Sequence, residues 1–175
     1  MNIKYFYFID EFNKNEIEKL PTQISLIYRN YHKKNGSKGL RKLIIHCKKN
    51  RRKVYISNNL KDAIKYNFDG LYIPSFQKHL RFQNITKKNL EIIGSAHNVV
   101  ELKIKEKQGC SYIFLSPIFK NKKNKKFLDV VKTNLLKRLT KNQIILLGGI
   151  NQKTIKRSKL CSPNGVAAIS WIKKK

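Results

Sequence analysis

Two segments near the end of the sequence carry residues suited to binding a phosphate group. Gly148 and Gly149 follow a short apolar run, and paired glycines let backbone N–H groups approach a phosphate closely. Ile169 and Ser170 end a second apolar run and offer a backbone N–H group and a hydroxyl. We therefore predict a phosphate site at these two segments. The alternative is that the glycines only form a tight turn.

The elements that must position these residues follow a regular alternation. Short β-branched and aromatic runs indicate strands, and apolar residues recurring every three or four positions indicate helices. The expected strands are Lys4–Asp10, Ile24–Arg29, Lys53–Ser57, Gly70–Ile73, Glu91–Ser95, Ser111–Leu115, Gln143–Leu147 and Gly165–Ser170. The expected helices are Glu11–Lys19, Gly39–Lys49, Leu60–Tyr66, Asn98–Gln108, Phe127–Leu139 and Asn151–Leu160, with a loop and a short helix over residues 74–89.

Strands and helices that alternate at this spacing form βαβ units with parallel strands. Eight such units close into a barrel, whereas five or six give an open sheet. We therefore predict an α/β fold, a short (β/α)8 TIM barrel occupying residues 1–175 as one domain, with the eighth helix missing. Ligands of such barrels lie at the C-terminal ends of the strands, and the last two loops commonly hold a phosphate.

The missing helix leaves the flank of the first and last strands uncovered. We expect a second subunit to cover it, which makes the protein a homo-oligomer. Light scattering that shows a monomer at micromolar concentration contradicts this expectation.

The formal net charge of +29 favours anionic partners. One interpretation is a polyanion ligand; the other is lysine and asparagine accumulated over the whole surface. No apolar run reaches the roughly 18 residues that span a membrane, and no signal peptide is evident. Three scattered cysteines favour a reducing cytosol over a disulfide framework. We expect a cytoplasmic protein without a membrane partner.

Four motifs, in order, resemble the thiamine-phosphate synthase and TenI-like tautomerase family. The resemblance extends from about Ile24 to Ile172. The motifs are Ile93-Gly94-Ser95-Ala96-His97-Asn98 with Glu101, the segment from Tyr112 to Ser116-Pro117-Ile118-Phe119, Leu147-Gly148-Gly149-Ile150, and Gly165-Val166-Ala167-Ala168-Ile169-Ser170.

The resemblance implies specific roles. The family's synthase joins a pyrimidine methyl pyrophosphate to a thiazole phosphate and releases pyrophosphate. Gly148, Gly149 and Ser170 match its thiazole-phosphate pocket. Ser95 matches a serine near the pyrimidine. Arg29 is the residue that survives of a Gln-x-Arg-x-Lys motif for pyrimidine and pyrophosphate, whose flanking positions are Ile27 and Tyr31 here.

This sequence departs from the family pattern at the residues that would bind the metal ion and pyrophosphate. The family's first magnesium aspartate aligns with Asn58 and its second lies near Gln77. Mg²⁺ is held mainly by carboxylates and substrate phosphates, so an active chain would need Mg²⁺ at degenerate ligands, and we assign no metal-binding residue. The family's pyrophosphate loop is replaced by residues 120–126, rich in lysine. Here Lys123 and Lys125 are candidates for neutralising pyrophosphate, unless the loop is only solvated.

Three functions remain open from the sequence. The first is a divergent thiamine-phosphate synthase, a transferase acting on phosphorylated small molecules. The second is a catalytically impaired barrel that only binds a phosphorylated, thiamine-related metabolite. The third, a nucleic-acid-binding protein, lacks a recognised motif, so we expect no specific nucleic-acid partner. The tautomerase activity is disfavoured, because Pro117 occupies the position of its histidine.

Overall fold

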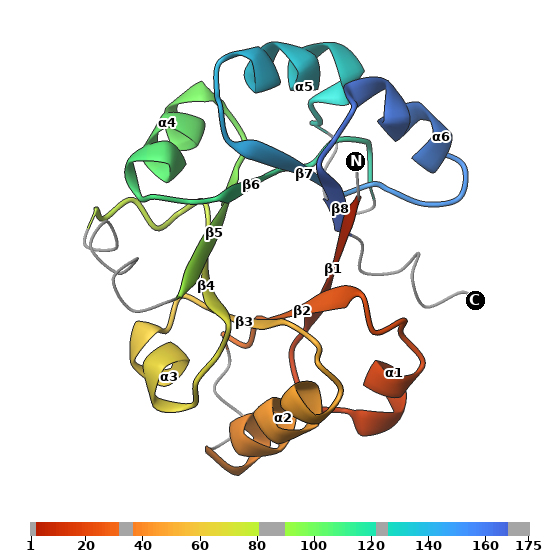
Figure 1. Ribbon diagram of the computed structural model, residues 1–175. Helices are drawn as coiled ribbons and strands as arrows, with labels where there is room; N and C mark the ends of the chain where they lie inside the picture. The colour runs from red at the N-terminus through yellow and green to blue at the C-terminus, as the bar shows by residue number, and fades with distance from the viewer. Residues whose placement is uncertain (1–2, 32–36, 81–89, 122–125, 168–175) are drawn as a thin grey trace.

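The computed structural model describes residues 3–31, 37–80, 90–121 and 126–167. Within them, eight parallel strands close into a barrel in which neighbours in sequence are neighbours in space, and β8 pairs with β1. Figure 1 looks down this ring of strands and shows the helices around its outside. The predicted α/β barrel is therefore confirmed.

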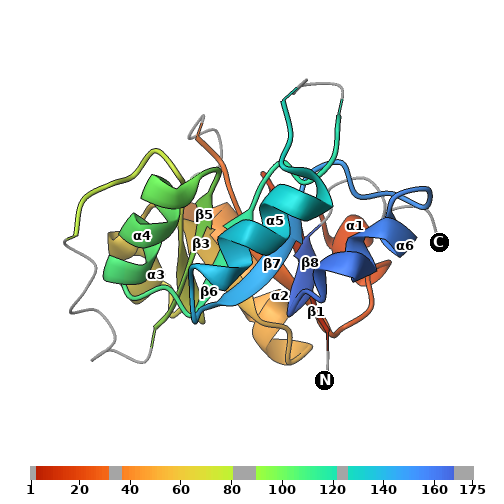
Figure 2. The ribbon, with the colours of Figure 1, turned by 90° about the horizontal axis from the view of Figure 1, so that it is seen from above.

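The strands match the predicted runs closely. They are β1 (Lys4–Ile9), β2 (Ile24–Tyr28), β3 (Val54–Ser57), β4 (Gly70–Ile73), β5 (Glu91–Ala96), β6 (Tyr112–Leu115), β7 (Gln143–Leu147) and β8 (Gly165–Ala167). Because all the strands are parallel, their C-terminal ends meet at one rim of the barrel. In Figure 2 the described parts of the segments after β2 and β6 rise on the same side.

The helices of the described residues are α1 (Lys14–Glu18), α2 (Ser37–Lys49), α3 (Leu60–Lys65), α4 (Val99–Lys107), α5 (Asp129–Arg138) and α6 (Ile155–Ser158), followed by the 3₁₀ turn Lys159–Cys161. Asparagine side chains cap three of them. Asn13, Asn59 and Asn98 each accept a hydrogen bond from the backbone N–H three residues later, which satisfies a donor that the helix leaves free. None of the described helices is long and apolar enough to cross a membrane.

The start predicted for the last helix was wrong. Residues 151–154 form a turn, and α6 begins only at Ile155. The side-chain oxygen of Asn151 accepts bonds from the backbone N–H groups of Lys153 and Thr154, and such local bonds compete with helix formation. Of the uncertain 74–89 segment, residues 74–80 contain no helix. Residues 81–89 and everything after β8 lie outside the described part, so the missing eighth helix stays a prediction.

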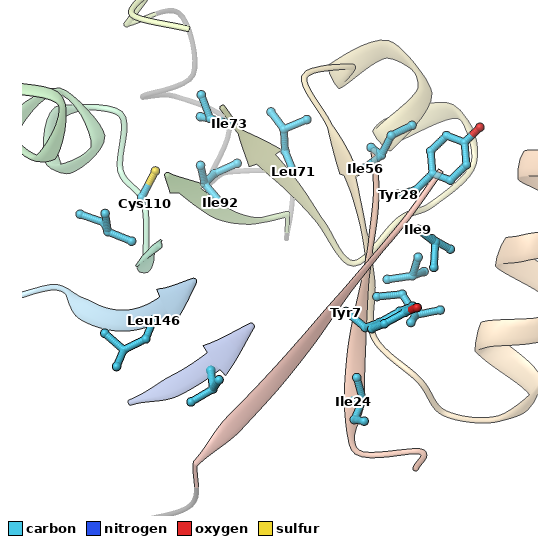
Figure 3. Packing of buried hydrophobic residues seen from close by; sticks show 14 of the residues in the cluster. Tyr7, Ile9, Ile24, Tyr28, Ile56, Leu71, Ile73, Ile92, Cys110 and Leu146 are labelled. Atoms are coloured by element: carbon cyan, nitrogen blue, oxygen red, sulfur yellow. The ribbon is translucent and has the colours of Figure 1, made fainter. Parts of the chain in front are cut away.

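Two layers of apolar side chains hold the barrel together. The outer layer lies between strands and helices and includes Tyr7, Tyr28 and Leu146 (Figure 3). The inner layer fills the barrel with aromatic rings: Phe6, Phe8, Tyr55, Tyr72, Tyr112 and Phe114. Several inner rings meet edge to face, a favourable arrangement. The barrel interior below the rim is therefore filled with packed side chains.

Candidate functional site

Arg29 lies at the rim directly after β2. Its backbone N–H donates to the carbonyl of Ile9, which continues the pairing of β2 with β1. Its guanidinium lies 4.6 Å from the centre of the Phe8 ring, and an aromatic face attracts a cation at this distance. The inner ring of Phe8 thus supports a partly exposed positive charge at the mouth of the barrel.

Ser95 lies near the end of β5 and is only 5% exposed. β5 pairs with β4, and the Ser95 side chain lies close enough to the hydroxyl of Tyr72 on β4 to affect its pKa. Burial raises the pKa of Tyr72 to about 12, although the Ser95 side chain and the charge of Arg29 both act to lower it. Tyr72 is therefore neutral at physiological pH. Arg29 lies over Phe8, whose ring meets that of Tyr72 edge to face, and Ser95 lies on the strand next to Tyr72, so the structure places these two predicted site residues on either side of Tyr72.

Asn58 and Gln77, which the resemblance places at and near the family's magnesium carboxylates, are hydrogen-bonded to each other. The Gln77 Nε2 donates to Asn58 Oδ1 at 3.1 Å. Asn58 has a φ of 53°, a left-handed conformation that asparagine tolerates better than most residues. Its N–H donates to the Tyr72 carbonyl, which anchors the pair beside the tyrosine.

Two buried side chains of α4 and its C-terminal turn hold the Gln77 loop. Lys105 Nζ donates to the Gln77 carbonyl oxygen at 2.8 Å and to Gln108 Oε1 at 2.8 Å. Gln108 Nε2 donates to the same Gln77 carbonyl at 3.0 Å and to that of His79 at 2.9 Å. Burial lowers the pKa of Lys105 to about 8. Sequence reasoning missed this lysine, because a lysine in a lysine-rich helix carries no distinctive signal.

The donors at this place do not fit Mg²⁺. Asn58 and Gln77 are neutral amides, and Mg²⁺ sites in proteins rely on carboxylates. The described residues contain no cluster of three or more histidine, cysteine or acidic side chains that could hold a metal ion. No step of the chemistry below is therefore assigned to a metal.

Tyr31 and Phe76 form an aromatic edge at the same side of the rim. Their ring centres lie 6.1 Å apart, and the Tyr31 hydroxyl lies 3.4 Å from Ser57 Oγ. Both rings are exposed, by 51% and 63%. By the resemblance drawn from the sequence, Tyr31 stands where the family motif has a lysine. Phe76 was not predicted, since it lies in a segment without clear periodicity.

A cavity of about 420 Å³ adjoins this edge on the outside of the barrel. It reaches from the ends of β2 and β3 to α3, and its lining includes Asn30, Ser57 and Lys61. It does not include Arg29, Ser95 or the glycines. The hollow therefore lies beside the predicted site and not over it.

The turn after β7 has a backbone conformation that favours glycine. Gly148 and Gly149 have φ values of 89° and 74°, a region that side chains rarely adopt. A Cβ on Gly149 would lie 2.3 Å from the Phe119 carbonyl oxygen, so the chain passes too closely there for any side chain. Phe119 N–H in turn donates to the Gly148 carbonyl.

The strand-eight half of the predicted phosphate site is only partly described. Leu147 pairs with Ala167, so the ends of β7 and β8 are adjacent, as a shared phosphate site needs. Ile169 and Ser170 themselves lie outside the described residues, as do Lys123 and Lys125 of the lysine-rich loop. Their roles stay predictions.

The histidine of the strand-five motif has a structural role. The backbone N–H of His97 donates to Glu101 Oε2 at 2.8 Å, and its Nδ1 lies 2.9 Å from the same oxygen. Together with the Asn98 cap, this ties the start of α4 to the end of β5. Part of the resemblance to the family is thus explained by helix capping.

Comparison with known proteins supports the resemblance. The sequence model of the thiamine monophosphate synthase family matches residues 19–172. A thiamine-phosphate synthase from Methanococcus vannielii is 24% identical over 120 residues, covering 67% of this chain and 58% of that protein. One from Prochlorococcus marinus is 29% identical over 129 residues, covering 72% and 37%. The chain thus spans little more than half the length of the first relative and less of the second.

Solved structures show the same architecture. Thiamine phosphate pyrophosphorylase from Pyrococcus furiosus superimposes with a TM-score of 0.77 at 17% identity, covering 98% of this chain and 91% of that one. The enzyme of that name from Bacteroides thetaiotaomicron gives a TM-score of 0.64 at 15% identity, covering 96% and 83%. At such identities the likeness establishes the fold. Because the family match extends over nearly the whole sequence, the chain belongs to the thiamine monophosphate synthase family.

Proposed function

We propose that the chain is a thiamine-phosphate synthase, joining a pyrimidine methyl pyrophosphate to a thiazole phosphate. The observation that carries the proposal is the placement of Arg29 and Ser95 around Tyr72: Arg29 lies over Phe8, whose ring meets Tyr72 edge to face, and Ser95 lies on the strand paired with that of Tyr72, at the rim of a barrel of this family. Both residues match family positions that contact the pyrimidine half. Gly148 and Gly149 supply the turn for the thiazole phosphate.

The chemistry requires positioning and charge stabilisation more than acid–base catalysis. The bond between the pyrimidine methylene carbon and the pyrophosphate oxygen breaks, and its electron pair leaves with pyrophosphate. The thiazole nitrogen donates its lone pair to the methylene carbon and forms the new C–N bond. Arg29 would neutralise part of the charge that develops on pyrophosphate, together with lysines of the 120–126 loop. Ser95 and Tyr72 would orient the pyrimidine by hydrogen bonds.

A second function is favoured by one specific observation. Asn58 and Gln77, which the resemblance places at and near the family's metal carboxylates, are neutral amides bonded to each other. A barrel without those carboxylates would retain the glycine turn and bind a phosphorylated, thiamine-related metabolite without converting it.

One experiment separates the two functions. The purified chain is incubated with both precursors, with Mg²⁺ or with EDTA, and thiamine phosphate is measured by chromatography. Binding of thiazole phosphate is measured in parallel by calorimetry. Product above the enzyme-free rate supports the synthase. Binding without product supports the second function, and neither product nor binding rejects both.

A further inference from the structure

Three oxygen atoms at the Asn58–Gln77 pair are each directed at hydrogen-bond donors. Asn58 Oδ1 accepts from Gln77 Nε2 at 3.1 Å, and Gln77 Oε1 accepts from the His79 N–H at 3.4 Å. The Gln77 carbonyl oxygen accepts from Lys105 Nζ and from Gln108 Nε2. Two donors occupy both lone pairs of the Gln77 carbonyl oxygen, and a cation at either amide oxygen would have to compete with the donor already there.

We propose that this arrangement closes the divalent-cation position of the barrel, with Lys105 as the positioning residue that holds Gln77 against Asn58. This part of the rim, at Asn58 and Gln77, therefore binds no divalent cation, and a phosphoryl group beside it is held by hydrogen-bond donors and cationic side chains. This inference concerns the same site as the proposed function. It rests on that function only for the identity of the phosphorylated ligand.

Charge acts in the same direction as geometry. The Lys105 side chain is fully buried and places an ammonium group directly on the Gln77 carbonyl. A positive charge in a poorly solvated position repels a second cation more strongly than one in water. The chain as a whole carries a formal net charge of +29, and its mean potential repels cations further.

The space for Lys105 depends on a glycine of the neighbouring strand. A Cβ on Gly94 would lie 2.8 Å from Lys105 Cδ and 2.9 Å from Cys110 Sγ. The absence of this atom lets the lysine stem lie against β5 and reach the loop after β4. Gly94, Lys105, Gln108 and Gln77 thus form one packed unit behind the rim.

The test is a titration of the full chain with Mn²⁺, a spectroscopic substitute for Mg²⁺, followed by electron paramagnetic resonance. We expect no saturable binding up to about 1 mM, the weak end of biological divalent-cation sites. The variant Asn58→Asp/Gln77→Glu restores two carboxylates. It should gain one saturable site that binds at least about tenfold more tightly than this limit.

A matched control separates a built site from added charge. Asn67→Asp/Gln152→Glu makes the same two substitutions at exposed positions, and Asn67 has a φ of 57°, close to that of Asn58. It should gain no site. Circular dichroism of each variant verifies the fold.

Saturable Mn²⁺ binding by the unmodified chain that Asn58→Ala/Gln77→Ala abolishes would overturn the inference. A folded carboxylate variant that gains no site would also count against it, since the cation position would then lie elsewhere. Failure of the synthase is a separate result, because absence of product leaves the Mn²⁺ titration unchanged.

Discussion

Lys105 Nζ lies 2.8 Å from the carbonyl oxygen of Gln77, and this hydrogen bond ties helix α4 to the loop after β4. Its partners are a carbonyl and a neutral amide. The ammonium is fully buried, and burial of a cation without a paired anion favours the neutral amine. The position of Gln77 at the rim therefore depends on a group whose charge is costly in the folded state.

The first prediction concerns the stability of the fold as pH rises. Burial lowers the pKa of Lys105 in the folded chain from its ordinary value of 10.5 to about 8. Between these values the unfolded chain binds more protons, so this group contributes stability that increases with pH. Between pH 7 and pH 9.5, the free energy of unfolding of the unmodified chain should rise by on the order of 2 kcal/mol relative to that of Lys105→Met.

Urea unfolding of both proteins at the two pH values measures this difference. Using the difference between the proteins removes the contribution of the exposed lysines, which both share. An unchanged difference would show that Lys105 is charged in both states throughout this range.

The second prediction compares two glycines with the same backbone strain. Gly149 and Gly109 have φ values of 74° and 75°. A Cβ on Gly149 would lie 2.3 Å from the Phe119 carbonyl oxygen, whereas one on Gly109 meets nothing within 4 Å. Gly109→Ala should cost about 1 kcal/mol of stability and leave ligand binding intact. Gly149→Ala should shift the turn and weaken thiazole-phosphate binding at least about tenfold.

Calorimetry with thiazole phosphate, at a temperature where both variants are folded, makes the comparison. Equal affinity for the two variants would remove the glycine turn from the phosphate site.

The third prediction concerns the cation above Phe8. Arg29→Gln should weaken the binding of inorganic pyrophosphate by about tenfold or more, because a charge-assisted hydrogen bond is lost. Arg41→Gln removes the same charge from an exposed position of α2. It should weaken binding by less than about twofold, because salt screens distant charges.

Calorimetry at physiological ionic strength gives both affinities. If the two variants lose affinity equally, pyrophosphate responds to the overall charge and not to a site at Arg29.

The strands and the residues at their ends were predictable, while contacts between distant loops were not. Arg29 and Ser95 lie at strand ends, and a parallel barrel brings all its strand ends to one rim. The Asn58–Gln77 pair depends on Lys105 and Gln108, which come 28 and 31 residues after Gln77. No local pattern encodes such a contact. Tyr72 was predicted only to lie in a strand, because the surroundings of its hydroxyl depend on Ser95 of the neighbouring strand.

The start of α6 could not be predicted for a different reason. Asparagine is a common residue at the start of a helix, so Asn151 was predicted to begin this one. In the structure its side-chain oxygen instead accepts hydrogen bonds from the backbone N–H groups of Lys153 and Thr154. Asparagine favours caps and turns equally, so the sequence alone does not choose between them.

The last prediction concerns Arg52, at the end of the barrel opposite the rim. Arg52 is 4% exposed. Its guanidinium donates to four backbone carbonyls from α1 to the start of β2: those of Ile17, Leu20, Pro21 and Ile24. Burial lowers the pKa of Arg52. The methionine in Arg52→Met can fill much of the space but leaves these carbonyls without donors.

Arg52→Met should therefore destabilise the fold by about 3 kcal/mol, the cost of several unsatisfied buried acceptors less the relief of a buried charge. In a protein of this size, that lowers the melting temperature by roughly 6–12 °C. The neighbouring Arg51→Met changes an exposed side chain in the same way and should be nearly neutral. Thermal unfolding followed by circular dichroism compares them, and equal melting temperatures would show that water replaces the guanidinium. Thiazole-phosphate affinity of folded Arg52→Met should stay unchanged, because function in such barrels resides at the opposite face.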